Sequence, residues 1–146
     1  MGKKIDVDDR FKKFGTVSFT AISKTNDFID YLEQGKVMGT RCDTCGKSFF
    51  PPRSNCYLCL DSPLNWFEVT GTGALVTYSR LQFAPIGFEA DLPYAIALLD
   101  YGDYKVFGRI ADDIPEEELK IGMPMKVRVN ELPNGQLNYV FEKPDS

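Results

Sequence analysis

Four cysteines within 18 residues constrain the fold of this chain more than any other feature. They follow the spacing Cys-x2-Cys-x10-Cys-x2-Cys, at Cys42, Cys45, Cys56 and Cys59. Two thiolates three positions apart can face one ion when the turn between them is tight, and Gly46 gives the first turn the backbone freedom that it needs. Two such turns facing each other bring four sulfurs together, which is the ligand set of a structural zinc site.

Two disulfide bonds are the alternative use of four cysteines. Residues 1–6 include two lysines but no apolar stretch follows them, so the start is not typical of a secretory signal. No apolar run approaches the ~18 residues that span a bilayer. We therefore expect a soluble, cytoplasmic protein whose thiols stay reduced and hold one structural Zn²⁺ per chain. Four cysteines alone do not separate zinc from iron, but zinc is the commoner structural ion.

Histidine is absent from all 146 residues, which excludes His-dependent serine and cysteine triads and His-based metal sites. A four-thiolate site would also use every cysteine, so no strong nucleophile remains. The acidic cluster at 112–118 fits the solvated start of a short helix better than an acid/base pair. We therefore expect no catalysis by this chain alone.

The sequence divides into three parts. Residues 1–35 form an N-terminal arm and a helix: 8–14 can form a short helix, 16–21 alternates as an extended arm would, and 26–34 carries one apolar stripe that ends at a glycine. Residues 36–65 form the four-cysteine zinc ribbon.

Residues 66–146 show the pattern of five strands. We expect strands over 67–81, 94–100, 104–110, 125–132 and 136–142, with a short helix over 114–119. The glycines at 71 and 73 suggest a bulge or a sharp coil in the first strand. Asn134-Gly135 is a strong hairpin signal between the last two. The fold class is therefore mainly β, a rubredoxin-like zinc ribbon with an N-terminal helix followed by a five-stranded OB-fold barrel.

An OB-fold barrel also allows nucleic-acid binding, which is the alternative function. Barrels of this class stack bases on aromatic rings above a basic groove. Residues 66–146 carry seven basic and thirteen acidic side chains, a net charge of −6. Contacts with phosphates dominate the affinity for nucleic acids, so an acidic barrel argues against this function.

Aromatic and apolar residues gather outside the expected strands. Phe49 and Phe50 precede two prolines within the ribbon, where the simplest role is to supply its small core. The loop at 82–93 is long for a hairpin and carries Phe83 and Phe88. We expect these two rings to fold back onto the end of the barrel; exposed together, they would form an interaction patch.

Three runs in the sequence resemble a known family. They are Cys-x2-Cys-Gly at 42–46, Phe-Pro-Pro-Arg at 50–53 before the second cysteine pair, and Ile-Gly-Met-Pro at 121–124. In this order, and over roughly residues 26 to 142, the chain is similar to the acyl-CoA-associated family of zinc-ribbon plus OB-fold proteins.

The resemblance implies a non-catalytic subunit that docks on a thiolase-fold enzyme and assists the binding or transfer of acyl-CoA. The ribbon and helix would form the docking surface, and Lys47 and Arg53 would meet the phosphates of CoA. The loop with Phe83 and Phe88 would cover the pantetheine site. The residues expected to contact acyl-CoA or the partner are thus Lys47, Phe49, Phe50, Arg53, Phe83 and Phe88.

Overall fold

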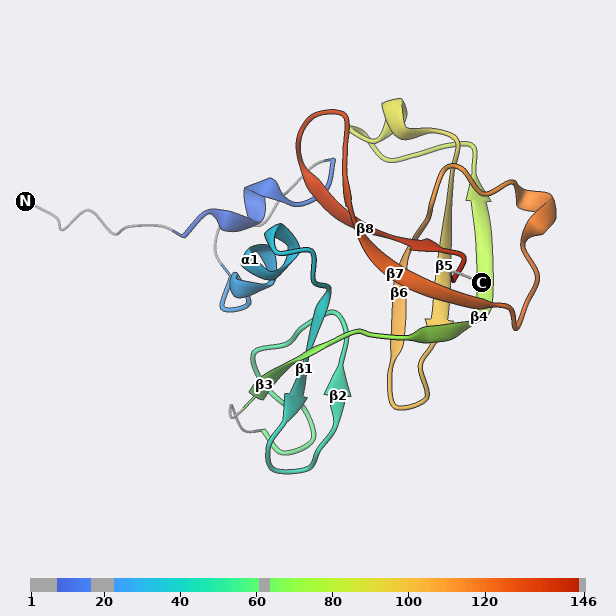
Figure 1. Cartoon of the computed structure of the whole chain (residues 1–146). Coiled ribbons are helices and arrows are strands. Elements are labelled where there is room, and N and C mark those ends of the chain that lie inside the picture. The colour runs from blue at the N-terminus through green and yellow to red at the C-terminus, as the bar shows by residue number, and fades with distance from the viewer. Residues whose placement is uncertain (1–7, 17–22, 61–63, 145–146) are drawn as a thin grey trace, which may run out of the picture.

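The computed structural model describes residues 8–16, 23–60 and 64–144. The described parts of the chain form two β-sheets, a three-stranded sheet followed by a closed five-stranded barrel. Figure 1 shows the small sheet to one side of the barrel, with the N-terminal helix beside both. The expected fold class, a ribbon followed by an OB-type barrel, is confirmed.

The small sheet consists of β1 (Met38–Cys42), β2 (Ser48–Phe49) and β3 (Leu64–Glu68), in the order β2-β1-β3 with antiparallel neighbours. In the first cysteine pair, Cys42 ends β1 and Cys45 lies in the turn that leads to β2. Because β3 returns along β1 after the second pair, both pairs are held at the same end of the sheet.

The strand expected over 67–81 is two strands, so this prediction was wrong. Its first two residues, Phe67 and Glu68, belong to β3, where Phe67 pairs with Gly39 of the ribbon. Its last ten residues form β4 (Thr72–Leu81), the first strand of the barrel. Gly71, with φ of 74°, lies between the two strands. The single irregularity of register in β4 lies between Leu75 and Thr77 rather than at the glycines.

The barrel contains β4, β5 (Tyr94–Asp100), β6 (Lys105–Ile110), β7 (Pro124–Glu131) and β8 (Leu137–Glu142). Their order around the barrel is β4-β5-β6-β8-β7, and β4 and β7 close it. All pairs are antiparallel except the short parallel pair β6–β8. The β7–β8 hairpin turns at Asn134-Gly135 as expected, with φ of 82° at the glycine.

The barrel core follows the alternation of each strand. Leu75, Leu99, Val106, Met125 and Phe141 are almost completely buried and belong to one cluster. The same cluster includes buried residues of the N-terminal helix, so the helix packs against the barrel. A second, smaller cluster surrounds the cysteines of the ribbon.

Helical structure is sparse and lies mostly outside the barrel. The helix expected over 26–34 is α1 (Asp27–Glu33), whereas the one expected over 8–14 is the single 3-10 turn η1 (Arg10–Lys13). The loop 82–93 contains η2 (Glu89–Asp91), and the segment 114–119 contains η3 (Glu116–Glu118). Most of the alternating segment at 16–21 lies outside the described residues. None of the helices in the described segments is long and apolar enough to cross a membrane.

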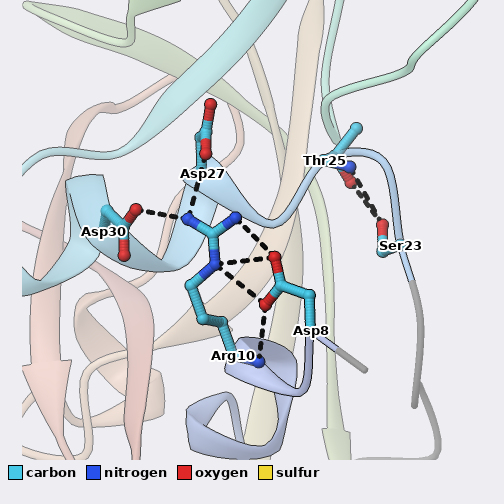
Figure 2. A network of polar contacts seen from close by, with 6 residues as sticks. All are labelled: Asp8, Arg10, Ser23, Thr25, Asp27 and Asp30. Carbon is cyan, nitrogen blue, oxygen red and sulfur yellow. Dashed lines mark hydrogen bonds and ion pairs between the residues drawn. The ribbon is translucent and has the colours of Figure 1, made fainter. Parts of the chain in front are cut away.

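The N-terminal turn is held on α1 by charge. The guanidinium of Arg10 donates to Asp8 within its own turn and reaches across to Asp27 and Asp30 on the helix (Figure 2). Its Nη1 atom lies 3.0 Å from Oδ1 of Asp27. One cation therefore joins two segments that the sequence separates.

Aromatic rings join the same segments to the barrel. The ring of Phe28 on α1 stacks with Phe11, at 6.2 Å between centroids, and meets Phe14 edge-on at 5.8 Å. Tyr139 of β8 lies within 6.5 Å of both Phe28 and Phe14. The arm, the helix and the barrel thus share one aromatic cluster.

Candidate metal centre and neighbouring surfaces

The four cysteines meet at one point although they come from two separate turns. Their Sγ atoms all lie within 4.8 Å of one another. In the first turn the backbone N–H of Gly46 donates to the carbonyl of Cys42 at 2.9 Å. In the second turn the N–H of Cys59 points to the sulfur of Cys56 at 3.5 Å. Both turns therefore direct their sulfurs towards one common point between them.

The spacing of the sulfurs fits a tetrahedral metal ion. Sγ of Cys45 and Sγ of Cys56 lie 3.7 Å apart. A disulfide would place them about 2.05 Å apart. Four ligands about 2.3 Å from a zinc ion lie about 3.8 Å from one another at the corners of a tetrahedron. These residues therefore fit zinc, and a four-sulfur site of this kind has no open position for a substrate.

The electrostatics of the cluster also favour a cation. The backbone N–H of Cys45 stabilises the thiolate of Cys42 and lowers its pKa to about 7. Hydrogen bonding to Cys45, reinforced by burial and by the other two sulfurs, raises the pKa of Cys59 to about 12. Without an ion the four groups cannot all ionise side by side, whereas a divalent cation stabilises every thiolate.

The ribbon encloses part of the centre in a small apolar core. Cys42 and Cys56 are buried, and Phe49 and Leu64 pack beside them. Phe49 was expected to contact acyl-CoA or the partner, yet only 6% of it is exposed. The reason is the size of the ribbon, which has few other side chains with which to cover its sulfurs.

Two expected contact residues flank an exposed ring. The Nζ atom of Lys47 lies 5.8 Å from the centroid of the Tyr57 ring, and the guanidinium carbon of Arg53 lies 5.3 Å from it. Tyr57, Leu58 and Leu60 are all exposed at the second cysteine turn. Sequence reasoning missed these three, although the spacing already placed them within or next to the second cysteine pair.

Phe50, another expected contact residue, lies where the ribbon meets the rest of the molecule. Its ring centroid is 5.4 Å from that of Tyr139 and 6.5 Å from that of Phe28, both in edge-on geometry. Phe50 is half-buried by these contacts. It joins the ribbon to the aromatic cluster of the helix and barrel.

The loop at 82–93 separates its two expected contact residues. Phe83 is 89% exposed and Ile86 is 90% exposed. The expectation that Phe83 folds back onto the barrel was therefore wrong, because no described neighbour covers it. Phe88 does fold back: it is half-buried, with the guanidinium carbon of Arg109 5.8 Å from its ring centroid.

Comparison with known proteins identifies both domains. The sequence model of the ChsH2 rubredoxin-like zinc ribbon domain matches residues 30–64. The model of the ChsH2 C-terminal OB-fold domain matches residues 66–130. The chain belongs to the ChsH2 family of zinc-ribbon and OB-fold proteins. The resemblance that the cysteine turns suggested is thus confirmed.

Two relatives share much of this ChsH2-like sequence. A protein of Methanocaldococcus jannaschii described as a DUF35 domain-containing scaffold protein is 34% identical over 92 residues, which are 62% of this chain and 64% of that protein. A protein of Pyrococcus furiosus with the same description is 29% identical over 97 residues, 66% of this chain and 71% of that protein. The chain thus aligns with slightly less than two thirds of the length of the first relative.

Solved structures share the ChsH2-like fold. The Ltp2-ChsH2(DUF35) aldolase gives a TM-score of 0.68 at 24% identity, over 84% of this chain and 96% of that chain. A DUF35 family protein of unknown function from Sulfolobus solfataricus gives a TM-score of 0.53 at 22% identity, over 81% of each chain. At these identities the likeness establishes the architecture.

Proposed function

We propose that this protein is a non-catalytic subunit that binds one structural zinc ion, docks on a thiolase-fold enzyme and assists the binding or transfer of acyl-CoA. The match to both ChsH2 domains, in the order ribbon then barrel, carries the proposal. The description of the relatives as scaffold proteins supports a role in assembly. The presence of ChsH2 beside Ltp2 in the aldolase supports an enzyme as the partner.

The chemistry of the chain supports an accessory role. The four sulfurs lie together in a set that fits zinc and leaves no position for a substrate. The chain has no histidine to act as a general base. The reacting groups therefore belong to the partner, and this subunit contributes a docking surface and a ribbon that the metal ion makes rigid.

Two regions fit the proposed contacts. Lys47 and Arg53 place two cations around Tyr57 at the ribbon, where the phosphates of CoA would find opposite charge. Phe83 and Phe88 belong to the loop that would cover the pantetheine site. The net charge of −6 over residues 66–146 continues to weigh against the nucleic-acid alternative.

Recovery of the partner from the cells of origin tests the proposal. The tagged full chain is purified under mild conditions, co-purifying proteins are identified, and the metal content of the same sample is measured. A thiolase-fold enzyme together with about one zinc per chain is the expected result. Nucleic acid in place of the enzyme, or a chain that carries no partner at all, would overturn it.

Single substitutions test the contacts once the complex is available. Replacing Arg53 with Gln removes one cation, and the Michaelis constant of the complex for acyl-CoA should rise while kcat changes little. Lys120→Gln is the control, since it removes an exposed cation that lies outside the ribbon, between η3 and β7. Full activity after Phe83→Ala and Phe88→Ala are combined would contradict the role of the loop.

A further inference from the structure

One outer face of the barrel is apolar, although outward positions on an antiparallel sheet in water are usually polar. Ala97 and Leu99 of β5 point into the core. The alternate positions of that strand, Tyr94, Ile96 and Leu98, therefore point outward. The paired strands continue this face: Leu98 lies opposite Phe107 of β6, and Tyr94 lies opposite Leu81 of β4.

This face forms the floor of a groove of about 410 Å³. Four parts of the chain shape it: residues 14–16 of the N-terminal arm, the end of β4 with the loop at 82–93, strands β5 and β6, and β8. The principal lining side chains are Phe88, Tyr94, Ile96, Phe107, Arg109 and Tyr139. A second, smaller hollow of about 200 Å³ shares Ile96 and Phe107 with it.

The charged side chain in this groove is already neutralised. Nη1 of Arg109 lies 2.8 Å from Oδ2 of Asp91, and both side chains are about four-fifths buried. The hydroxyl of Thr16 donates to the same carboxylate. The guanidinium carbon lies 4.1 Å from the centroid of the Tyr94 ring. Arg109 thus has its carboxylate and its aromatic face within the protein, and it offers no unpaired charge to a phosphate.

We infer that this groove binds an uncharged, elongated apolar group of the acyl-thioester class. Its volume lies within the about 300–1,000 Å³ range of small-molecule sites, and such sites combine apolar walls with few polar groups. A neutral groove lined by aromatic rings gains free energy by burying hydrocarbon, at about 25 cal/mol per Å² of apolar surface. It gains little from a phosphate, which would lose its hydration without meeting a free cation.

The shape favours a small molecule over a flat protein surface. Residues 14–16, the 82–93 loop, strands β5 and β6, and β8 all line the groove, although they are distant in sequence. A protein partner would instead find the exposed side chains of Phe83 and Ile86. The naming of an acyl thioester as the natural ligand rests on the proposed function; the preference for an uncharged apolar group rests on the groove alone.

The test uses the isolated zinc-loaded chain and a neutral probe, S-octanoyl-N-acetylcysteamine. Backbone amide resonances are followed during titration with the probe and, separately, with 3′-phosphoadenosine 5′-phosphate. We expect the probe to shift resonances of β5, β6 and the 82–93 loop, while the nucleotide leaves them unchanged. Shifts confined to the ribbon, or no saturable shift at all, would overturn the inference.

A matched pair of variants locates the binding site. Ile96→Trp fills the floor of the groove and should weaken binding of the probe at least about tenfold, a loss of about 1.4 kcal/mol. Lys105→Trp places the same side chain at an exposed outward position of β6 that does not line the groove. Equal affinity of the two variants for the probe would overturn the inference, provided that both keep the dispersed amide spectrum of the native chain.

The partner assay separates this inference from the proposed function. If Ile96→Trp abolishes recovery of the enzyme and the native chain does not bind the probe, the face is a protein contact and the inference fails while the proposed function stands. If the native chain binds the probe but recovers no enzyme, the groove stands and the proposed function fails.

Discussion

Leu60 occupies in the second cysteine turn the place that Gly46 occupies in the first, and both residues have a left-handed backbone. Each directly follows the second cysteine of its pair, with φ of 75° at Gly46 and 55° at Leu60. Glycine adopts this conformation freely, whereas a residue with a β-carbon pays about 1–2 kcal/mol for it. The two turns thus share one geometry, and the second maintains it with an unfavourable residue whose side chain is 87% exposed.

Replacing Leu60 with Gly should stabilise the zinc-loaded protein. The substitution removes the left-handed penalty and deletes an almost fully exposed side chain, so we expect a gain of about 1 kcal/mol. For a chain of this length the Tm should rise by about 2–4 °C, measured by calorimetry in the presence of zinc. The reverse substitution, Gly46→Leu, should lower the Tm; a Leu60→Gly variant that melts at or below the native temperature would contradict the argument.

Removal of zinc should unfold the ribbon before the barrel. The one tryptophan of the chain, Trp66, lies on β3, pairs with Thr40 of β1 and packs on Tyr31 of α1 at 5.3 Å between ring centroids, so its emission reports on the ribbon sheet and its junction with the helix. Chelation, or Cys42→Ser, should shift this emission to the red and reduce bound zinc to near zero. The amide resonances of the barrel core should persist, because that core forms a separate cluster.

The pH dependence of zinc retention has a definite sign. Neighbouring sulfurs and burial raise the pKa of Cys59 to about 12, so zinc must displace a proton from this group on binding. Affinity for zinc should therefore fall as the pH falls. Ser54→Ala, a change within the ribbon that removes no sulfur, is the control and should retain zinc like the native chain.

Local patterns explain why much of this architecture could be predicted. The cysteine spacing is set within each turn. The positions of Cys42 and Cys45 therefore predict that both sulfurs bind the same metal ion, whatever the rest of the fold. Alternation likewise placed the strands that end at Ile110 and Glu142 within a few residues. Asn134-Gly135 marked its hairpin because the turn itself requires positive φ.

Errors arose where distant partners decide the outcome. The segment 67–81 was expected to be one strand with a bulge or sharp coil at Gly71 and Gly73, and only pairing with β1 on one side and with β5 on the other divides it into β3 and β4. Phe49 is buried because it packs against the cysteine sulfurs in the small core of the ribbon. Phe83 is exposed because no described segment packs against it. Neither outcome is encoded near the residue itself.

Tyr139 should be a main link between the ribbon and the barrel. Its hydroxyl donates to the carbonyl of Phe107 at 2.6 Å, and its ring packs edge-on against Phe50 of the ribbon and Phe28 of the helix. Tyr139→Phe keeps the ring and loses one hydrogen bond, so the free energy of unfolding should fall by about 1 kcal/mol. Tyr139→Ala also opens the aromatic cluster and should cost about 3–5 kcal/mol. Equal losses in the two variants, measured by denaturant unfolding, would show that the ring packing contributes nothing.

Arg10 should hold the N-terminal turn on α1 in a manner that depends on salt and pH (Figure 2). Its hydrogen bonds hold the pKa of Asp8 well below the ordinary value of 3.8. A carboxylate with a lowered folded pKa stabilises the protein above its ordinary pKa, and this contribution is lost as the pH falls towards the folded value. Arg10→Gln removes the cation, so the variant should melt below the native chain near neutral pH.

The difference in Tm between Arg10→Gln and the native chain is the quantity that tests this link. It should narrow as the pH falls below about 3.8, because Asp8 of the unfolded chain then takes up a proton while the folded carboxylate keeps its charge until the pH is lower still. It should also narrow in about 1 M salt, because these groups are partly exposed and open to screening. Lys12→Gln is the control, since Lys12 pairs only with Asp9 of its own turn at 3.4 Å among the described residues. A difference that stays constant across pH and salt would mean that Arg10 acts through packing of its hydrocarbon stem and not through its charge.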